Sequence, residues 1–308
     1  MSANKKRLAG VSSEQTYCSA ARCIVRGAIK DVRHWLQLAA DAACADDGEN
    51  VHRLRVATRR ASVALKAFRD LTDPIEADAL RDALSQIRKA ADVARNIDAT
   101  SEHLLSQCAD ASDELREKLR SRLGTSRAHS QAPITAMLRK LDEAHFDERI
   151  KALLSHIKHN HPKRCLVPYG KQARRILKPV VKKFFRAAKS GVSNDDELHA
   201  LRIRAKKLRY TMEITSVAFG PEFMDALYQK CCECQDIMGS IRDCVIMQEL
   251  LRDWLATPCD DAERTFLKKL LSLETASHTR WMRTFHTLWK TSYVARLKRD
   301  FDTHLKSE

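Results

Sequence analysis

The amino-acid sequence predicts an all-α protein made of two similar helical bundles. Glycine and proline are scarce, with 8 and 7 of the 308 residues, while the helix-favouring residues Ala, Leu, Arg, Lys and Glu are abundant. No segment shows the sustained alternation of apolar and polar residues that marks a strand. A basic sequence also occurs twice, which indicates an internal duplication.

The first half of the chain shows a succession of helical patterns. We expect helices over residues 12–44, 51–70, 75–94, 98–122, 133–142 and 143–158. Asn50 is a candidate N-cap for the second of these helices, and Pro74 suits a first helical turn. A break is predicted near Gly124, and the polar stretch 121–131 is predicted to be a loop.

The second half repeats this plan after a polar, histidine-rich linker at residues 156–162. A basic helix is expected to end near Lys189, where Ser190 and Gly191 break it, and another helix begins near Asp195. Gly220-Pro221 predicts a further interruption, and helical patterns fill the rest of the chain.

The two halves share a repeated sequence at a fixed offset. Residues Val51–Arg60 reappear as Leu198–Lys207, so that His52 and His199 lie 147 residues apart. Arg95 and Arg242 are separated by the same offset, and no gap is needed between the two landmarks. A shared length over two helices and their connection predicts two related bundles around a pseudo-two-fold axis.

The predicted domain organisation follows from this repeat. We expect a single domain over residues 1–308 that consists of two repeats. The N-terminal bundle covers residues 12–158, and the C-terminal bundle covers residues 163–305.

Each repeated helix is predicted to carry a basic face opposite an apolar face. At about 100° per residue, Arg55, Arg59 and Lys66 fall within about 60° of His52. The apolar residues opposite this first stripe are Leu54, Ala61, Leu65 and Phe68. The matching stripe of the second copy contains His199, Arg202, Lys206 and Arg209, and the residues opposite it are Leu201, Leu208 and Met212.

These basic faces predict an anion-binding site. A charge run is usually a solvated face, but such faces mix both signs, whereas residues 51–69 contain no acid. Like charges spaced three and four residues apart destabilise a helix unless an anion neutralises them. The net charge of +15 makes the whole molecule attractive to anions such as nucleic acid, anionic membranes and polyphosphate.

Two further basic helices are expected to line the sides of the anion-binding site. Residues 149–194 contain no acid, and one side of the helix in this segment gathers Arg174, Arg175, Lys178, Lys182 and Lys189. The first helix adds Arg22, Arg26 and Arg33, which are expected to do the same in the other half.

The two His-x-x-Arg helices, each followed at a fixed distance by an arginine-containing segment, resemble the CHAD family (conserved histidine α-helical domain). The resemblance runs from about residue 12 to residue 300 and is strongest over Leu198–Tyr210. It implies two four-helix bundles around a pseudo-two-fold axis with a basic pore or groove between them, and it implies binding of inorganic polyphosphate. The contacts that it implies are His52, Arg55, Arg59, Arg60, His199, Arg202, Lys206, Lys207 and Arg209, with Arg95 and Arg242 as the second motif of each half.

The first repeat departs from this pattern at two positions. Ser62 stands where the repeat and the family would place a counterpart of Arg209, and Asn96 stands where the second copy has Asp243. The N-terminal contacts are therefore expected to be the weaker ones. Nothing in the chain resembles the strand-rich CYTH triphosphatase domain to which CHAD modules are often fused.

Residue chemistry favours polyphosphate over the alternatives. Arginine offers a planar fork to two phosphate oxygens, and lysine offers a mobile point charge. Binders of single-stranded nucleic acid interleave aromatic residues with basic ones, and here only Tyr210 stands beside a stripe, so nucleic acid is the second candidate. Association with polyphosphate-metabolising proteins is a further expectation.

No catalytic residue, metal site or cofactor is predicted. The neighbours of His52 and His199 are cations, which would repel a metal ion, and there is no phosphate-binding glycine-rich loop. A phosphatase would need several acids to hold Mg²⁺, whereas Asp98 and Asp243 are expected to orient the second-motif arginines by ion pairing. We therefore expect a binding protein and not an enzyme.

The ten cysteines and the hydropathy pattern predict a soluble protein of a reducing cytoplasm. The cysteines lack the regular spacing of a disulfide-rich domain. The cluster of Cys231, Cys232 and Cys234 is expected to be structural thiols in a helix. No apolar run reaches the roughly 18 residues of a membrane span, and the basic N-terminus lacks the apolar region of a secretion signal. The family resemblance places the protein at polyphosphate granules.

Overall fold

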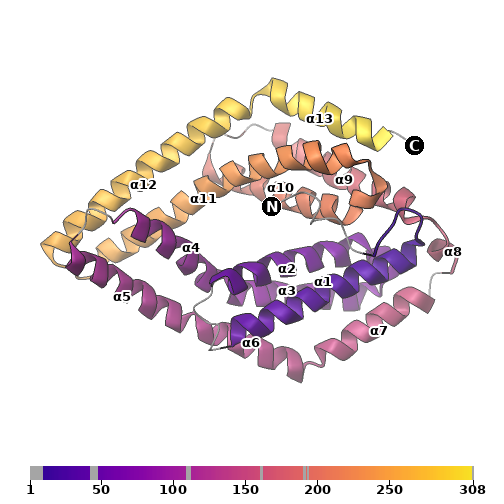
Figure 1. Cartoon of the computed structure of the whole chain (residues 1–308), viewed down its shortest axis with the longest axis horizontal. Helices are drawn as coiled ribbons and strands as arrows, with labels where there is room; N and C mark the ends of the chain where they lie inside the picture. Colours follow the sequence, from indigo (N-terminus) through magenta and orange to yellow (C-terminus); the bar gives the residue numbers. More distant parts are fainter. Residues whose placement is uncertain are drawn as a thin grey trace.

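The chain folds into helices throughout the part that the structure describes (Figure 1). The computed structural model describes residues 10–41, 48–108, 112–159, 162–189, 192 and 194–306. Within these ranges there is no strand, and the one extended contact is an isolated bridge between Thr16 and Pro168. The all-α prediction is therefore confirmed.

The helices of the first half are mostly short and follow one another closely. They are α1 (Tyr17–Ala40), α2 (Gly48–Ala67), the 3-10 turn η3 (Arg69–Leu71), α3 (Pro74–Ala90), α4 (Asp92–Ser106), α5 (Asp113–His129), α6 (Gln131–Glu143) and α7 (Phe146–His159). The prediction for Pro74 is confirmed, because it opens α3 behind Asp73, whose side chain accepts a hydrogen bond from the Glu76 amide.

The second half contains the longest of the described helices, α11 and α12. Its elements are the short α8 (Pro162–Cys165), α9 (Tyr169–Lys189), α10 (Asp195–Thr215), the 3-10 turn η4 (Ser216–Ala218), the π-helical η5 (Phe223–Leu227), α11 (Tyr228–Ala256), α12 (Asp261–Leu288) and α13 (Thr291–Lys306). Gly220-Pro221 does interrupt the helices, between η4 and η5. The predicted break at residues 190–191 lies outside the described residues.

Several predicted boundaries were wrong. Asn50 lies inside α2 and is not its cap. Gly124 and the polar stretch 121–131 do not form a loop, because α5 continues through them to His129. The helix is held there by Arg127, whose Nε donates to Asp98 at 2.7 Å. At the predicted linker, α7 extends to His159, and residues 160–161 lie outside the described residues.

Three apolar cores hold the described helices together. The first lies mainly among α1, α2, α3, α6 and α7, and it also takes in Tyr169, whose hydroxyl donates to the Ile214 carbonyl at 2.7 Å. The second lies among α9, α10, α11 and α13. The third joins α4 and α5 to α11 and α12. The two halves are therefore packed against each other, and the division into two duplicated bundles stays a prediction.

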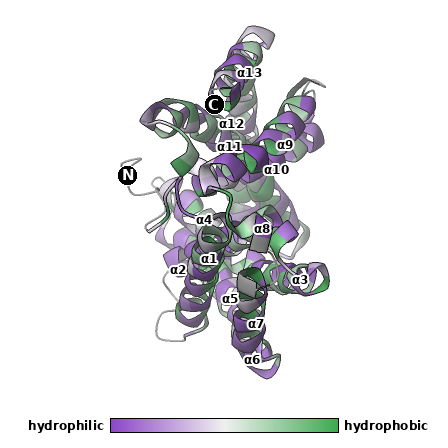
Figure 2. Cartoon of the chain, turned by 90° about the vertical axis from the view of Figure 1, so that its right-hand side faces the viewer, coloured by the Kyte–Doolittle hydropathy of each residue, from purple (hydrophilic) through white to green (hydrophobic). Residues whose placement is uncertain are grey.

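The predicted faces of the two repeated helices are confirmed on their apolar sides. Leu54, Leu65 and Phe68 of α2 are fully buried, and so are Leu208 and Met212 of α10. In Figure 1 these two helices occupy the middle of the molecule, while α12 and α13 follow one edge and α5, α6 and α7 follow the other. Figure 2 shows hydrophilic and hydrophobic residues mixed along the same helices, as expected of amphipathic helices.

The expectation that all cysteines are reduced thiols is wrong for one pair. Cys18, at the start of α1, and Cys165, at the end of α8, form a disulfide. The adjoining segments are also bonded to each other, since the Tyr17 amide donates to the Val167 carbonyl at 2.9 Å. The two cysteines lie 147 residues apart, which is the repeat offset, so they occupy matching positions of the two copies. Cys231 and Cys234 are buried free thiols, as predicted, while Cys232 is half-buried.

A membrane span is not found. Among the described helices, none combines the length and the apolarity that crossing a bilayer requires.

Candidate anion-binding site

Helices α2 and α10 lie against each other and bring the two predicted stripes together. Arg88 near the end of α3 and Arg95 near the start of α4 act on the stripe of α2, and Arg242 in the middle of α11 acts on the stripe of α10. Nine basic residues gather there, and we call them the central cation cluster: His52, Arg55, Arg59, Arg88, Arg95, His199, Arg202, Lys206 and Arg242.

Lys206 shows a large pKa shift, and arginines from both halves of the chain contribute to it. Burial and the charges of Arg59, Arg202 and Arg55 lower the pKa of Lys206 to about 6. Burial and the neighbouring arginines, Arg59 first among them, lower the pKa of Arg55 to about 9. Like charges are thus held together in a place where solvent screens them poorly.

Carboxylates compensate part of this charge at the ends of the cluster, where Glu49 acts on His52, Asp196 on His199 and Glu249 on Arg242. Asp92 forms an ion pair with Arg55, and Asp243 lies near enough to Arg202 and Lys206 to act on both. In the described part of the chain, Arg59, Arg95, Arg202 and Lys206 form no ion pair with a carboxylate. The Nε atom of Arg202 is also buried without a hydrogen-bond partner. The cluster can therefore accept an anion.

The expected pairing of the second-motif arginines with the adjacent aspartates is wrong. Asp98 binds Arg127, and Arg242 reaches Glu249, with Nη1 and Oε1 3.8 Å apart. Neighbouring positions on a helix point about 100° apart, so Asp243 faces Lys206 and Arg202 while Arg242 turns away from it.

The surroundings of the two histidines favour their neutral form. Burial, Arg95 and other nearby cations lower the pKa of His52. Burial and Arg242 lower the pKa of His199 in the same way. A neutral imidazole keeps one N–H, which can donate to a phosphate oxygen.

Two predicted contacts, Arg60 and Arg209, lie elsewhere and converge on a buried acid. Arg60 Nε donates to Glu213 Oε2 at 2.7 Å, and Tyr228 Oη donates to Glu213 Oε1 at 2.7 Å. Arg209 Nη1 is 3.7 Å from Glu213 Oε1, and Arg209 Nε donates to Gln235 at 3.1 Å. The Glu213 side chain is only 6% exposed, and this network engages both arginines within the protein, with one of their two charges compensated by Glu213.

Lys66 and Lys207 also lie apart from the central cation cluster. They meet each other, and the charges of Lys183 of α9 and Arg204 of α10 act on Lys207 as well. We call these four residues the lysine flank. Burial and the neighbouring cations, Lys66 first, lower the pKa of Lys207 to about 8.

The predicted wall residues divide into bound and exposed ones. Arg33 of α1 pairs with Asp142, and its Nη2 is 3.7 Å from Asp147. Arg174 of α9 donates to the backbone carbonyls of His304 and Ala218, at 2.9 and 2.8 Å. The exposed wall residues are Arg26, Arg175, Lys178 and Lys182, and Arg22 is half-buried.

Arg88 belongs to the cluster although sequence reasoning missed it. It comes from α3, lowers the pKa of Arg55, and has its own pKa lowered by burial and by Arg59. The repeat could not reveal it, because the residue at the same offset in the second half is Gln235.

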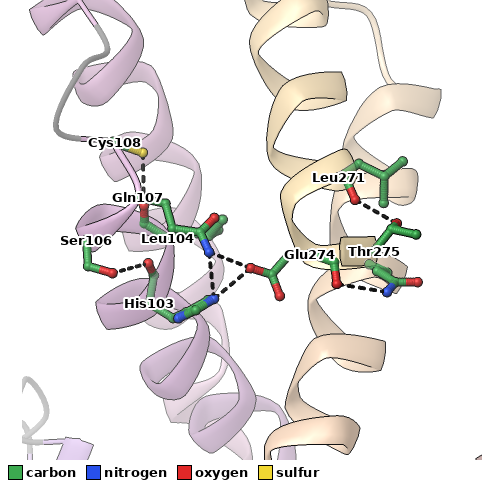
Figure 3. Close-up of polar contacts among 9 residues, drawn as sticks. His103, Leu104, Ser106, Gln107, Cys108, Leu271, Glu274 and Thr275 are labelled. Atoms are coloured by element: carbon green, nitrogen blue, oxygen red, sulfur yellow. Dashed lines mark hydrogen bonds and ion pairs between the residues drawn. The ribbon is translucent and has the colours of Figure 1, made fainter. Parts of the chain in front are cut away.

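Two pockets open beside the cluster, one on each side of α11. The first, of about 300 Å³, is lined by His199, Arg202 and Arg242 together with acids such as Asp195. The second, of about 290 Å³, lies among α4, α11 and α12. In the second pocket Glu274 is fully buried and accepts hydrogen bonds from His103 and Gln107, each at 2.6 Å (Figure 3).

A family model decides the classification. The model of the CHAD domain matches residues 26–252, which is more than two thirds of the chain. The chain belongs to the CHAD family. All nine residues of the central cation cluster fall inside the match, whereas α12 and α13 lie outside it.

Two solved structures share this fold. The crystal structure of the CHAD domain from the plant Ricinus communis matches with a TM-score of 0.63 and 16% sequence identity, covering 96% of this chain and 95% of that one. PptA from Streptomyces chartreusis matches with a TM-score of 0.66 and 16% identity, covering 89% of this chain and 99% of that one. A search of curated protein sequences found no match.

Proposed function

We propose that this CHAD protein binds inorganic polyphosphate, without chemistry, across the central cation cluster. The observation that carries the proposal is the meeting of Arg55 and Arg59 with Arg202 and Lys206. These side chains come from separate halves, are largely withdrawn from water and have few compensating acids. A polyanion that enters the cluster removes the repulsion among them.

The chemistry of the cluster suits a flexible chain of phosphates. Arginine binds two phosphate oxygens at once, lysine binds one, and the neutral His52 and His199 can donate an N–H. CHAD domains are linked in general to polyphosphate and triphosphate binding, which supports the same ligand class. The exposed cations of α9, Arg175, Lys178 and Lys182, are proposed as outer contacts.

Nucleic acid is the second candidate, and the site lacks the features that favour it. Base stacking needs an accessible aromatic ring. Tyr210, the aromatic residue that follows the second stripe, is 2% exposed and lies under Arg209. Its ring is therefore closed to a base.

The proposal of a binding protein, and not an enzyme, rests on the positions of the acids. Hydrolysis of polyphosphate would need free carboxylates to hold Mg²⁺ beside the chain. Asp92 is paired with Arg55, and Asp243 lies among Arg202 and Lys206. Both acids thus compensate the positive charge of the neighbouring cations.

Cellular roles follow from this activity as further proposals. A protein that holds polyphosphate without consuming it can reside at polyphosphate granules in the cytoplasm. It can also meet the enzymes that make or degrade the polymer there.

The experiment that tests the proposed function is a titration of the purified chain with long-chain polyphosphate, with and without DNA or RNA as competitor. We expect tight binding that nucleic acid displaces poorly. Release of orthophosphate from the polymer in the presence of Mg²⁺ would overturn the non-catalytic part, and preferential displacement by RNA or DNA would overturn the ligand.

A further inference from the structure

The pocket between α10 and α11 carries both signs of charge on its walls. It has a volume of about 300 Å³, and its charged and titratable residues are His199, Arg202, Arg242, Asp195, Asp196 and Glu249. Two of the acids have partners, since Asp195 Oδ1 lies 3.1 Å from His278 Nε2 and Glu249 Oε1 lies 3.8 Å from Arg242 Nη1. Among the described residues, Asp196 forms no ion pair. One carboxylate of the pocket is therefore available to a ligand.

The internal repeat explains why Asp196 has no partner. Its counterpart 147 residues earlier is Glu49, whose Oε1 accepts a hydrogen bond from Arg53 Nε at 2.8 Å. The counterpart of Arg53 is Ala200, so the second copy lacks this ion pair. Asp196 acts on His199 through its charge, and its exposed carboxylate can accept a hydrogen bond from a ligand.

Arg202, on the same pocket, has lost its partner in the same way. Its counterpart Arg55 forms an ion pair with Asp92, and the residue at the repeat offset from Asp92 is Gly239. The Nε atom of Arg202 is buried without a hydrogen-bond partner, although the charge of Asp243 acts on Arg202 from outside the pocket. A buried N–H without an acceptor is costly, and a ligand oxygen would remove that cost.

The pocket also lies where the corresponding residues of the first half touch each other. A Cβ atom on Gly48 would lie 3.0 Å from the Cβ atom of Asp98, and Asp98 accepts a hydrogen bond from Arg127 Nε at 2.7 Å. The counterparts of Gly48 and Asp98 are Asp195 and Val245, and both line the pocket. The second half therefore has a cavity at positions that are in contact in the first half.

An unpaired cation and an unpaired acid on one pocket define the chemistry of the ligand. Arg202 can bind an anionic phosphate oxygen, whereas the carboxylate of Asp196 can only accept a hydrogen bond. A phosphate inside a polyphosphate chain has no hydrogen to donate. A terminal phosphate keeps a P–OH group that ionises with a pKa of about 6, as in phosphate monoesters. The two residues therefore suit the end of a chain and not its interior.

We propose that the pocket between α10 and α11 binds the protonated terminal phosphate of a polyphosphate chain, with Arg202 donating to one oxygen and Asp196 accepting from the P–OH group. The long chain is that of the proposed function, on which this inference rests, and Arg202 connects the pocket to the central cation cluster. Orthophosphate carries the same protonated group, and the experiment separates it from a chain end.

The experiment compares linear triphosphate, which has terminal phosphates, with cyclic trimetaphosphate, which has none. Asp196→Ala removes the acceptor, and Ala200→Arg gives Asp196 the kind of partner that Glu49 has. Each variant also raises the net charge by one, so general electrostatic attraction alone predicts tighter binding of both ligands. The control is Asp261→Ala, which removes an exposed acid from the first turn of α12 and changes the net charge equally.

Calorimetric titration at pH 6 measures the affinities. We expect Asp196→Ala and Ala200→Arg each to weaken linear triphosphate by about tenfold, the effect of losing a hydrogen bond to a charged group. Cyclic trimetaphosphate should bind both variants as it binds the control. Equal changes for the two ligands, or tighter binding of linear triphosphate, would overturn the end site. Orthophosphate that binds as tightly as linear triphosphate would overturn the assignment to a chain end.

Long-chain polyphosphate separates this inference from the proposed function. If linear triphosphate binds with the stated dependence on Asp196 but long chains do not bind, the proposed function fails and the pocket site stands. If long chains bind but Asp196→Ala leaves linear triphosphate unaffected, the pocket site fails and the proposed function stands.

Discussion

Arg60 of α2 and Glu213 of α10 form an ion pair across the two halves of the molecule, with Nε and Oε2 2.7 Å apart. Glu213 also accepts from Tyr228, and it lies close to Arg209. The basic residues of the repeated helices thus serve two purposes. Some bind a buried acid inside the protein and join its halves, and the others are available to an anion.

The Glu213 network should contribute measurably to stability. Glu213→Ala leaves Arg60, Arg209 and Tyr228 without their acceptor, so we expect the free energy of unfolding to fall by about 2–3 kcal/mol. This is below the range for fully buried pairs because Arg60 is partly open to water. Urea denaturation measures the change. The exposed pair of Glu49 and Arg53 provides the control, where Glu49→Ala should cost under about 0.5 kcal/mol. Equal losses in the two variants would contradict the assigned role.

Lys206 should destabilise the free protein as pH falls. The unfolded chain holds this proton up to the ordinary pKa of 10.5, and the folded chain releases it near a pKa of about 6, so the free energy of unfolding should rise with pH across this window. Lys206→Met should flatten that dependence and raise stability at pH 6. The control is Lys268→Met, an exposed lysine of α12. Denaturation curves at several pH values measure the pH dependence of the free energy of unfolding. The same pH dependence in the Lys206→Met and unaltered proteins would refute the burial of this charge.

Polyphosphate binding should take up protons at pH 7. Burial and neighbouring cations lower the pKa of Lys206 to about 6, and an anion in the cluster raises it again, so binding should take up on the order of one proton. Calorimetry in buffers with different ionisation enthalpies measures this number. Lys206→Met should reduce it, and a binding heat that does not depend on the buffer would argue against the mechanism.

Chain length should separate a shared site from two independent ones. Arg202→Ala with Lys206→Ala removes the α10 side of the cluster and leaves Arg55 and Arg59 in place. Long chains, which we expect to contact both halves at once, should lose about tenfold or more, and triphosphate should lose less. Affinities against chain length supply the measurement, with Lys268→Ala and Lys269→Ala as the control. Losses of equal size for short and long ligands would show that the halves act separately.

The contact between His103 and Glu274 should give a second pH dependence of opposite sign. The hydrogen bond to Glu274 raises the pKa of His103, whereas burial would lower it. This stabilisation is complete below the unfolded pKa of 6.5 and is lost as the pH rises through the raised folded value. His103→Gln should therefore destabilise the protein below pH 6.5 more than at alkaline pH. Thermal unfolding of both proteins across this pH range measures the destabilisation. A loss of stability in His103→Gln that does not vary with pH would contradict the ion pair.

Periodicity and the repeat predicted the helical class, the buried faces of α2 and α10, and the basic composition of the stripes. They could not assign the stripe residues to separate environments. Arg60 and Arg209 lie in the same sequence segments as Arg59 and Lys206. Both arginines pair with Glu213, an acid near the end of α10, and so lie outside the central cation cluster. The position of an acid relative to a neighbouring helix depends on how the helices pack, which periodicity does not contain.

The expected weakness of the first repeat illustrates the same limit. Ser62 was expected to leave that copy one cation short. Ser62 Oγ donates to the Thr58 carbonyl at 2.8 Å, while its counterpart Arg209 belongs to the Glu213 network. Neither position therefore adds to the central cation cluster. Arg88, which does add to it, has no basic counterpart at the repeat offset.

The central claim is that a phosphate polymer bridges Arg55 and Arg59 of one half and Arg202 and Lys206 of the other. Its most direct test is a salt-dependent titration of the purified protein with long-chain polyphosphate, with RNA and DNA as competitors. The account predicts tight binding that weakens steeply with salt, as release of counterions requires, and poor displacement by nucleic acid. Binding that ignores salt, or that RNA or DNA displaces more readily than triphosphate does, would contradict it.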